Sequence, residues 1–549
     1  MALAPVQLSL RIIHKSFAAK GAEVRVLDGL SFDIHEQDFV SIIGPSGCGK
    51  STIFNIIAGL IEADSGGLVY RGEDVASLRG RVGYMMQKDL LFPWRTVLGN
   101  VLLGLEMRGI AHRTAVERAR EHLHAFGLSG FENAYPKTLS GGMRQRVALI
   151  RTLIMDPGIL LLDEPFSALD YQTRLYLEGV LKQAVEKFHK TVVLVTRHRR
   201  GGGFVQARRR AQRPAGTRQG RPRHRDRRAF ADRGAQRPSL RRLFPHLVRR
   251  ARHSDRSATA GSTRVMSVIT AGKPAGVEPQ RPARRKRSPF NTAIGRALLQ
   301  AGAVAALLLI WQVGVRIGWI SDFLFGAPAG IYTTFVRMAA SGELLSDTFT
   351  TLFEAILGFV IGTIFGSIAG LVLWYSIFVA RLVEPFIVAI NSVPKIALAP
   401  IIILWFGTGL VSKVALAVSL TAIVALIAAY QAAKDADTDL QALLISMGAT
   451  KHQIFYKAVV PSTIPPIIAT FRINIGFGLV GAVVGEFISS QHGLGHLIYT
   501  ASSFYDLNTV WVGLFVLMLV GFALYYVIDM VERLLIPWKV STATHLVQV

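Results

Sequence analysis

Apolar residues follow two different patterns along the chain. In the first 196 residues they form short runs, such as Phe39–Ile43, Val82–Met86 and Ile159–Leu162, separated by polar stretches. Runs of this length between turn signals predict buried strands. Beyond residue 290 the apolar runs reach about 20 residues, the length that crosses the hydrocarbon core of a bilayer. Six such runs predict six membrane-spanning helices, at 295–318, 349–375, 383–405, 411–433, 464–488 and 511–532.

Basic residues near the ends of these runs indicate their orientation. The run Arg284–Arg287, the loop 434–457 and the tail 533–539 carry Lys and Arg, so we expect them on the cytoplasmic side. The loop 492–506 then lies outside, and both ends of the helical region lie inside. Lys413 is an exception, because it falls on the outer side.

A glycine-rich loop stands between the run Phe39–Ile43 and an apolar helical stretch, Ile53–Leu60. It consists of Gly44, Pro45, Ser46, Gly47, Cys48, Gly49, Lys50, Ser51 and Thr52. Glycines let consecutive backbone N–H groups point at phosphate oxygens, and the helix N-terminus adds partial positive charge. Lys50 can reach the β- and γ-phosphates and the Ser51 hydroxyl can ligate Mg²⁺. The pattern predicts a site for ATP with Mg²⁺.

Other polar residues of the first region fit the same chemistry. The run Ile159–Leu162 ends in Asp163 and Glu164, and a buried strand has little structural use for paired carboxylates. Asp163 is placed to hold Mg²⁺, and Glu164 to polarise an attacking water. Phe17, ahead of the loop, is a candidate to stack on adenine, with ordinary core packing as the alternative.

The stretch Leu139–Gln145 opens a helix. Ser140 can cap it, and Gly141 and Gly142 leave backbone N–H groups free to face a phosphate. Taken alone, these residues indicate only a helix cap.

In order and spacing, the phosphate loop, Gln87, Leu139–Gly142, Asp163–Glu164 and Ser167–Asp170 resemble the ATPase of ABC transporters. The resemblance implies an α/β P-loop ATPase domain in which two copies sandwich two ATP molecules head to tail. The residues Ser140 to Gly142 would then act on the nucleotide of a second copy, or of a separate ATPase subunit. The resemblance also implies that Gln87 serves catalysis and Mg²⁺, and that the surface near it touches the membrane subunit.

The chain departs from this family at the end of the domain. The family places a histidine directly after the last strand, which here ends at Thr196. Arg197 follows instead, and His198 comes one position late. His198 could contact the γ-phosphate only if the loop shifted.

Residues 197–265 have an unusual composition, with 22 Arg and 3 Asp but no Lys or Glu. They supply +19 of the formal net charge of +26. Three interpretations compete: an arginine-rich arm that binds nucleic acid, a disordered linker, or coding sequence translated in a shifted reading frame. GC-rich codons read one base out give mainly Arg, Ala, Gly and Pro, so we favour the last and expect no nucleic-acid partner. The coding DNA would separate the three.

Composition adds two limits. Cys48 is the one cysteine, so no disulfide can form within the chain, which suits a reducing cytosol. Residues 1–20 lack the long apolar core of a signal peptide. We therefore expect the first domain in the cytoplasm.

The loop after the fourth apolar run resembles the loop by which bacterial importer permeases dock on their ATPase. Its markers are Gly448, which lets the chain turn between two short helices, and Pro461, which starts the next span. Leu91–Trp94, predicted to form a stiff turn with exposed aromatic rings, supports the same comparison. Together with the helical region it resembles the nitrate, sulfonate and taurine branch of ABC importers, which also includes transporters of thiamine-pyrimidine precursors and riboflavin.

The third apolar run contains Pro394, Lys395 and Pro400. Such residues in a span are costly unless they face protein or water. Lys395 either attracts an anion in the pathway or pairs with a carboxylate such as Glu384. Glu486, at the outer end of the fifth run, is open to the same two interpretations.

The sequence thus predicts an ABC-type ATPase at 1–196, the Arg-rich segment at 197–265, a basic cytoplasmic lead-in at 266–293 and an all-α permease domain at 294–540. The resemblance implies ATP-driven import of a small solute, such as nitrate, a sulfonate or taurine, across the bacterial inner membrane. Membrane lipid and a periplasmic solute-binding protein are the expected partners. The competing hypothesis is a product of two joined genes that binds ATP and hydrolyses little. A nucleic-acid-dependent ATPase rests on the Arg-rich segment alone.

Overall fold

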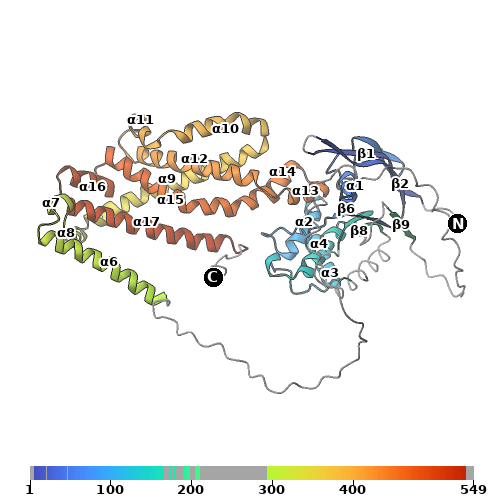
Figure 1. The fold of residues 1–549 in the computed structure, drawn as a ribbon, viewed down its shortest axis with the longest axis horizontal. Helices are drawn as coiled ribbons and strands as arrows, with labels where there is room; N and C mark the ends of the chain where they lie inside the picture. The colour runs from blue at the N-terminus through green and yellow to red at the C-terminus, as the bar shows by residue number, and fades with distance from the viewer. Residues whose placement is uncertain are drawn as a thin grey trace, which may run out of the picture. The chain divides into compact units, whose positions relative to one another are not determined.

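The computed structural model describes residues 5–19, 22–45, 47–165, 174, 179, 190–197, 205–210 and 293–538. The chain divides into two compact units, 1–211 with 304–549, and 212–303. The first unit holds the mixed α/β region and nearly all of the long apolar helices (Figure 1).

The strands of the first unit form two sheets. One is antiparallel, in the order β2-β1-β4-β5, and the other has the order β6-β7-β8-β3-β9, with β6, β7, β8 and β3 parallel and β9 antiparallel to β3. The strands are β1 (Val6–Ala19), β2 (Ala22–His35), β3 (Asp38–Gly44), β4 (Ser65–Tyr70), β5 (Glu73–Val75), β6 (Val82–Met85), β7 (Ile159–Asp163), β8 (Thr191–Arg197) and β9 (Val205–Arg210). The apolar runs predicted to be strands therefore lie in β3, β6 and β7.

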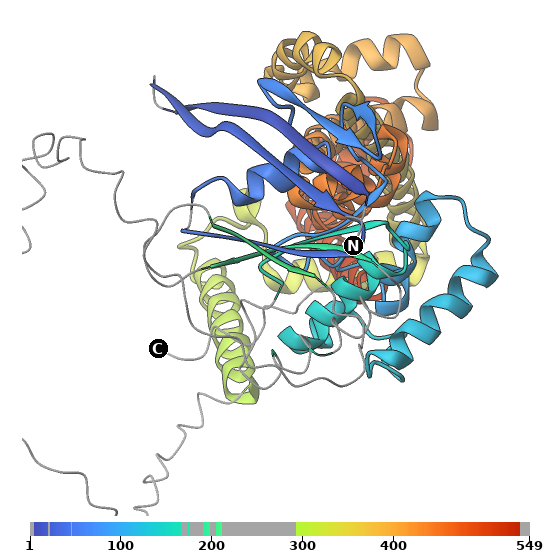
Figure 2. The ribbon, with the colours of Figure 1, turned by 90° about the vertical axis from the view of Figure 1, so that its right-hand side faces the viewer.

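Both faces of the parallel sheet are covered, which explains its uninterrupted apolar runs. Along β7, Ile159 and Leu161 pack with the antiparallel sheet and α1 (Lys50–Ile57). Leu160 and Leu162 point the other way, into a core shared with α2 (Val97–Met107), α3 (His112–Ala125) and α4 (Gly141–Leu153). Figure 2 shows these cyan helices on one side of the sheet and the dark blue β1–β2 ribbon on the other. A short 3₁₀-helix, η1 (Pro136–Thr138), leads into α4.

The turn Leu91–Trp94 was predicted to expose its aromatic rings, and this prediction is wrong. Phe92 is fully buried and packs edge to face against the half-buried Trp94, with 5.4 Å between ring centroids. The Asn100 side chain of α2 accepts a hydrogen bond from the Phe92 N–H (2.7 Å) and donates one to its carbonyl (3.2 Å). The turn is thereby attached to α2, and its rings fill the core.

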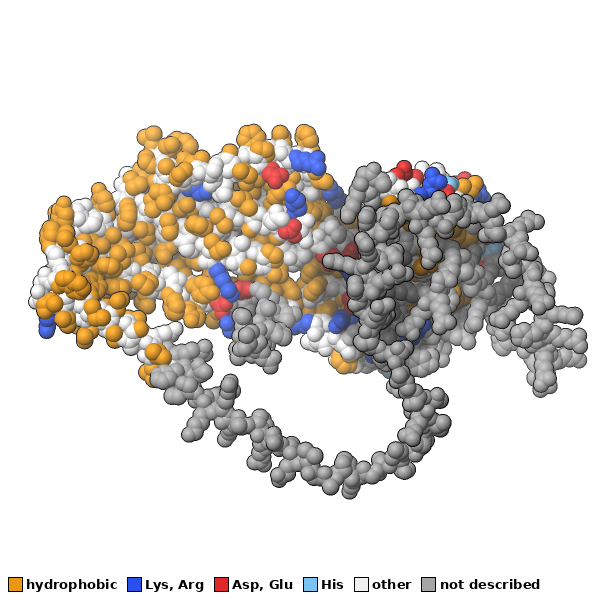
Figure 3. Space-filling view, in the orientation of Figure 1, with side chains coloured by type: hydrophobic (Ala, Val, Ile, Leu, Met, Phe, Trp, Pro, Cys, Tyr) orange, Lys and Arg blue, Asp and Glu red, His pale blue; other side chains and the backbone are white. Residues whose placement is uncertain are grey.

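The described part of the chain beyond residue 292 is helical. Its elements are α6 (Ala293–Arg316), α7 (Asp322–Phe325), α8 (Pro328–Ser341), α9 (Glu343–Val372), η4 (Leu373–Tyr375), α10 (Ile377–Ser392), η5 (Lys395–Leu398), α11 (Ala399–Phe406), α12 (Leu410–Lys434), α13 (Thr438–Ser446), α14 (Lys451–Ile454), the π-helical turn η6 (Phe455–Val459), α15 (Val460–Ser489), α16 (Leu494–Ser503) and α17 (Leu507–Leu535). In Figure 3, apolar side chains cover most of the visible surface of these helices, as lipid contact requires.

Five helical stretches of the described chain are long and apolar enough to cross a membrane: α6, α9, α12, α15 with the turns before it, and α17. They correspond to the first, second, fourth, fifth and sixth predicted spans. The third, 383–405, is not one helix, because α10 and the η5–α11 stretch meet at an angle of 87°. Pro394 lies at the break, where proline has no N–H to continue the helix. Counting the bent pair as one span gives the predicted six.

Lys395 at this break interacts locally. Its ammonium donates to the main-chain carbonyl (3.0 Å) and the side-chain oxygen (3.2 Å) of Asn391. Of the two interpretations of Lys395, pairing with Glu384 is not seen among the ion pairs of the described residues, and attraction of an anion stays a prediction.

Glycines set the contact between α9 and α12. A Cβ at Gly362 would lie 2.0 Å from the Thr421 hydroxyl oxygen, and one at Gly366 would lie 2.1 Å from the carbonyl oxygen of Ala422. The absence of side chains at these two positions lets the helix backbones approach closely, the usual packing device of membrane helices.

We expect Gly366→Ala to lower the thermal unfolding midpoint of the purified chain by several degrees. The added methyl would meet a main-chain oxygen that cannot rotate away, and overpacking of this kind costs about 1–3 kcal/mol. Gly476→Ala, on α15, is the matched control because nothing lies within 4 Å of its Cβ position. The unfolding midpoints of both variants are measured by heating the protein in detergent and quantifying the remaining folded fraction by size-exclusion chromatography. Equal shifts for the two variants would contradict the packing argument.

Candidate nucleotide site and its contacts with the helical region

The glycine-rich loop connects β3 to α1, as predicted. Gly49, directly before α1, has φ of +91°, a conformation that favours glycine. A Cβ there would also lie 2.9 Å from side-chain atoms of Val26 and Leu27. Glycine therefore lets the chain turn sharply into the helix, so that the first N–H groups of α1 face the loop. Ser46 lies outside the described residues.

The Lys50 ammonium lies within the loop. It donates hydrogen bonds to the carbonyl oxygens of Gly44 (2.9 Å) and Pro45 (2.6 Å), and Cys48 Sγ lies 3.7 Å away. The Lys50 side chain is buried, whereas Ser51 is exposed in the first turn of α1 and Thr52 is half-buried. Phosphate oxygens are stronger acceptors for an ammonium than neutral carbonyls are, so an entering phosphate can compete for Lys50.

Asp163 and Glu164 end β7 as predicted, and both are buried. Glu164 has φ of +47°, uncommon for a residue with a side chain, and its N–H donates to the Val195 carbonyl of β8 at 3.1 Å. The Gln87 side-chain amide donates to a Glu164 carboxylate oxygen at 3.2 Å. The structure therefore brings together two predicted site residues that are far apart in the sequence.

Tyr84 of β6 links α1 to the strands beside Asp163. Its hydroxyl donates to the Asn55 side chain of α1 at 3.0 Å. Burial raises the pKa of Tyr84, and the negative charge of Asp163 raises it further. The hydroxyl therefore stays neutral and keeps its hydrogen bond to α1 at physiological pH.

Ser51 and Asp163 offer the oxygen ligands that Mg²⁺ prefers. Within the described residues there is no group of three or more His, Cys, Asp or Glu side chains that could hold a metal. Mg²⁺ is usually bound by one or two protein oxygens together with waters and substrate phosphates. The donor set thus fits a Mg²⁺ that arrives with a nucleotide.

The residues Ser140 to Gly142 form the start of α4. The Ser140 hydroxyl accepts a hydrogen bond from the Met143 N–H at 3.3 Å and so caps the helix. Ser140 and Gly141 are exposed and Gly142 is half-buried. This helix N-terminus is accessible to a phosphate carried by another molecule.

Phe17 lies on β1 opposite Val24 of β2. Its side chain is 38% exposed, and the Lys15 ammonium lies 5.6 Å from the ring centroid. The exposed ring does not fit ordinary core packing and stays a candidate for stacking on adenine.

His198 lies outside the described residues. Arg197, the last residue of β8, pairs with Gly44 in the β3–β8 ladder. The end of β8 therefore lies beside the start of the phosphate loop.

Arg151 of α4 is a residue that sequence reasoning missed. Its buried guanidinium donates to the carbonyl oxygens of Leu90 (2.7 Å) and Asp89 (2.8 Å). Burial lowers the pKa of Arg151 to about 10, against the opposing effect of Asp89, so the group is still charged at neutral pH. Arg151 thus holds the segment that follows Gln87. Its position on an apolar helix face carried no signal of this role.

That segment and residues 79–80 contact the loop that contains Gly448. Gly80 and Gly448 both have positive φ, and a Cβ on Gly80 would lie 3.3 Å from the Gly448 Cα. The Gly80 N–H donates to the Ser446 carbonyl at 2.9 Å, and Arg79 donates to the Ile445 carbonyl at 3.0 Å. Gly448 therefore lies where the α/β region meets α13.

Two further features extend this contact. Leu440, Leu443 and Leu444 of α13 belong to the same apolar core as α2 and α4. At the edge of the contact, the Lys88 ammonium lies 2.7 Å from an Asp439 carboxylate oxygen. The contact thus has an apolar centre and a charged rim.

Glu106 of α2 binds two cations, one on each side of this contact. Its carboxylate accepts two hydrogen bonds from the Arg95 guanidinium (3.0 and 3.1 Å) and also binds the Lys457 ammonium of η6. Burial alone would raise the pKa of Glu106, but the bonds to Arg95 and Lys457 outweigh it, and the pKa is lowered.

Pro461 was predicted to start the fifth span; it lies in the first turn of α15, but the helical stretch begins earlier. The π-helical turn η6 comes directly before it, so the helical stretch runs on from Lys451 to Ser489. The part of the loop that follows Gly448 is therefore a direct extension of the span.

Comparison with known proteins agrees with this architecture. Residues 27–167 match the family model "ABC transporter", and residues 362–537 match "Binding-protein-dependent transport system inner membrane component". An uncharacterised ABC transporter ATP-binding protein of Bacillus subtilis, YtlC, is 47% identical over 185 residues, which cover 34% of this chain and 71% of that protein. The chain belongs to the ABC transporter family. It joins an ATPase domain and a multi-pass permease domain of an ABC importer in one polypeptide.

Two other relatives of this ABC transporter carry substrate names. The taurine import ATP-binding protein TauB of Rhizobium johnstonii is 45% identical over 190 residues, covering 34% of this chain and 72% of TauB. The aliphatic sulfonates import ATP-binding protein SsuB of Bacillus cereus is 41% identical over 189 residues, covering 34% of this chain and 74% of SsuB.

We expect Glu106 and Lys457 to be energetically coupled across the ATPase–permease contact. In a cycle of Glu106→Gln, Lys457→Met and the double variant, the unfolding free energies should deviate from additivity by about 0.5–3 kcal/mol, as residues in direct contact do. Thermal or denaturant unfolding of the purified chain measures the cycle. The exposed pair Arg113–Glu117 of α3, away from this contact, is the matched control and should be close to additive, because solvent screens it.

The sign of the pH dependence follows from the lowered pKa of Glu106. A carboxylate whose pKa is lowered by folding adds stability above its unfolded-state pKa and loses it as pH falls through the folded-state value. The coupling should therefore be full at neutral pH and disappear in acid. Additive effects of the two substitutions at pH 7 would contradict the assignment.

Proposed function

We propose that this chain hydrolyses ATP at the glycine-rich loop to import a small solute across the bacterial inner membrane. The observation that supports it best is the position of two consecutive residues. Gln87 donates to the Glu164 carboxylate at 3.2 Å, and its neighbour Lys88 pairs with Asp439 of the permease domain at 2.7 Å. A hydrogen bond, one peptide step and an ion pair thus connect the candidate catalytic carboxylate with the permease.

In this proposal each site residue has a distinct role. Lys50 and the N–H groups of the loop hold the phosphates, and Phe17 stacks on the adenine. Glu164 accepts a proton from the attacking water, for which its buried, fixed position is suited. Mg²⁺ supplies positive charge that neutralises the phosphate oxygens when it is bound, and Ser51, Gln87 and Asp163 would hold it.

Hydrolysis would reach the permease through the same residues. Loss of the γ-phosphate changes what surrounds Gln87, and any displacement of Gln87 moves Lys88 and the segment held by Arg151. That segment and Gly80 lie against α13, and residues 451–489 continue from the contact into a span. Movement at the nucleotide can thus be converted into helix movement, the form of change that alternating access requires.

A second copy of the chain completes each site in this proposal. The exposed start of α4, Ser140 to Gly142, binds the nucleotide held by the partner's loop. Two chains would supply two ATPases and two permeases, although separate subunits could take either place. A periplasmic solute-binding protein would deliver the solute.

The substrate proposed here is a small organic solute that carries a sulfonate group. Two of the relatives are named for aliphatic sulfonates and for taurine, which support this class. Nitrate, thiamine-pyrimidine precursors and riboflavin are the alternatives within the same branch of importers.

We expect Glu164→Gln to reduce ATP hydrolysis by at least about a hundredfold while ATP binding is retained, because the amide cannot accept the proton. Phosphate release from the purified chain in lipid nanodiscs measures turnover, and a fluorescent ATP analogue measures binding. Lys50→Ala should lose both. An unmodified chain that binds ATP but does not hydrolyse it in any lipid would instead support the joined, non-transporting product.

Mixing two inactive chains tests whether the sites are shared. Lys50→Ala disables a phosphate loop, and Ser140→Arg blocks the opposing helix start. A head-to-tail dimer of one chain of each kind has one site with both changes and one intact site. Phosphate release should therefore reappear when the two are co-reconstituted, but not with either alone. If all site residues came from the same chain, the mixture would stay inactive.

A further inference from the structure

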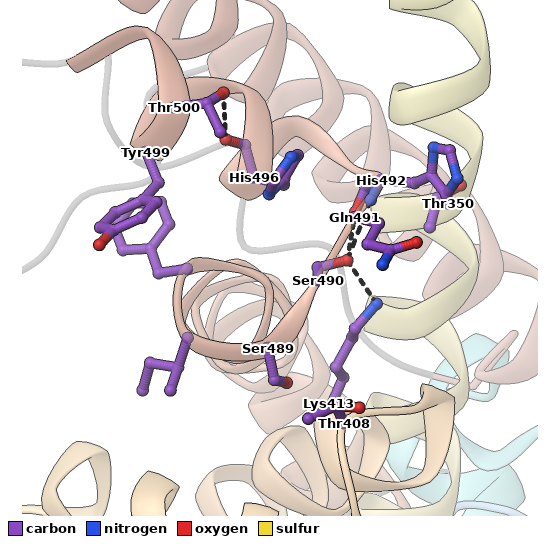
Figure 4. Close-up of a pocket in the computed structure, with 12 residues that line it drawn as sticks. Thr350, Thr408, Lys413, Ser489, Ser490, Gln491, His492, His496, Tyr499 and Thr500 are labelled. Carbon is purple, nitrogen blue, oxygen red and sulfur yellow. Dashed lines mark hydrogen bonds between the residues drawn. The ribbon is translucent and has the colours of Figure 1, made fainter. Parts of the chain in front are cut away.

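A cavity of about 650 Å³ lies in the permease domain at the end predicted to face outward. Four helices and two connecting segments contribute to it: α9, α12, α15, α16, the residue Thr408 before α12, and residues 490–492 after α15. Its volume is in the range of small-molecule sites. Figure 4 shows the polar side chains that line it, with Lys413 extended toward Ser490 and Gln491.

Lys413 is the main charge of this cavity. Its side chain is 8% exposed, and its ammonium binds the Glu354 carboxylate (2.8 Å) and the Ser490 hydroxyl (2.7 Å). An ammonium has three hydrogens, and these partners account for two of them. The third hydrogen is available to an acceptor in the cavity.

The other basic side chains on the cavity wall are His492 and His496, and no carboxylate is among the residues that line it. Glu354 lies behind Lys413, and Glu486, which is fully buried, accepts bonds from the Thr351 hydroxyl (2.7 Å) and the Gly495 N–H (2.6 Å). The acids of this region are thus bound within the protein, and the cavity itself presents donors and bases.

The wall that carries the histidines is held firmly. Three consecutive N–H groups donate to buried side chains: Gly493 to Asp347 (2.8 Å), Leu494 to Thr351 (2.9 Å) and Gly495 to Glu486 (2.6 Å). A Cβ at Gly493 would lie 2.2 Å from a Glu486 carboxylate oxygen, so glycine is required there. His492 and His496 flank this anchored turn, and their positions relative to Lys413 are therefore fixed before a ligand arrives.

We infer that this cavity binds the anionic group of the imported solute, with Lys413 as its charge partner and His492, His496 and Gln491 as further donors. An oxyanion with several equivalent acceptors, such as a sulfonate, matches a set of donors spread around one ammonium. The inference rests on the proposed import function and adds to it a place and a chemical class of ligand. Charge at the solute, rather than its shape alone, is what the cavity recognises.

Methanesulfonate and dimethyl sulfone test this directly, because they are similar in size and differ in charge. Both are offered at millimolar concentration to the full chain carrying Glu164→Gln in nanodiscs, and binding is followed by saturation-transfer NMR on the methyl signals. We expect a signal from methanesulfonate and at least about tenfold weaker binding of dimethyl sulfone, since an ammonium–sulfonate bond is charge-assisted.

Variants identify the cavity as the site. Replacing the pair together, Lys413→Met with Glu354→Met, leaves no orphan charge and should weaken methanesulfonate binding about tenfold, whereas Lys413→Arg should keep it. His496→Gln should weaken it less. Lys434→Met is the matched control and should change nothing, because this exposed lysine ends α12, the helix of Lys413, far along the chain from the cavity residues.

Several outcomes would overturn the inference. The first is equal binding of methanesulfonate and the neutral sulfone. The second is undiminished methanesulfonate binding by the Met pair. The third is a loss of binding that appears only with Lys434→Met. The Met pair could also weaken binding of a solute-binding protein while leaving methanesulfonate binding unchanged. That result would overturn the inference and identify the cavity as a docking surface for the solute-binding protein. Because binding is measured without turnover, a chain that binds methanesulfonate but never hydrolyses ATP contradicts only the proposed function.

Discussion

The contact between two glycines, Gly80 and Gly448, sets how closely the ATPase and permease domains can meet. A Cβ on Gly80 would lie 3.3 Å from the Gly448 Cα, and a Cβ on Gly448 would lie 3.2 Å from the Gly80 Cα. Both residues also have a positive φ, which favours glycine. With the backbones together, the apolar face of α13 joins the core of α2 and α4, and Lys88 and Glu106 reach their partners at the rim. A displacement of the ATPase at this point would therefore press on the permease main chain. Close-packed contacts of this kind transmit displacement because they cannot absorb it.

The permease domain keeps charges within its spans, and the structure shows how two clusters of them are tolerated. Lys413 and Glu354 face each other at 2.8 Å between α9 and α12, and Arg472 of α15 lies 2.5 and 2.7 Å from Asp529 and Glu532 of α17. Paired charges are far less costly in such surroundings than single ones, and removal of one partner costs more than the pair contributes. The Lys413 pair lies next to a cavity, whereas the Arg472 cluster links two helices.

Local sequence made the secondary structure around the candidate nucleotide site predictable, with the glycine-rich loop between β3 and α1 and Asp163 at the end of β7. The phosphate loop and the Asp163–Glu164 pair are contiguous in sequence, and their residue types have few structural alternatives. Contacts over long separations were not predictable in the same way. Lys457 binds Glu106 from 351 positions away, and neither residue stands out in its own segment. The Leu91–Trp94 turn shows a second limit, since it is attached to α2 by hydrogen bonds with Asn100 that no periodicity reveals. In the membrane domain, hydropathy located the third span. Hydropathy is a mean over many residues, so it did not reveal the 87° bend that lies at Pro394.

The strand β9 has a consequence for the unusual segment that contains it. Residues 205–210 pair with β3 from Asp38 to Ile43 through main-chain hydrogen bonds, which any sequence can supply. An arginine-rich stretch can therefore pair at the edge of this sheet, because main-chain pairing at an edge requires little of the side chains. This holds whether or not the segment is translated in a shifted reading frame. The strand that it covers leads directly into the glycine-rich loop. A deletion intended to remove the Arg-rich segment would have to begin after Arg210, since one that begins at Arg197 would leave that edge open to pairing with another molecule.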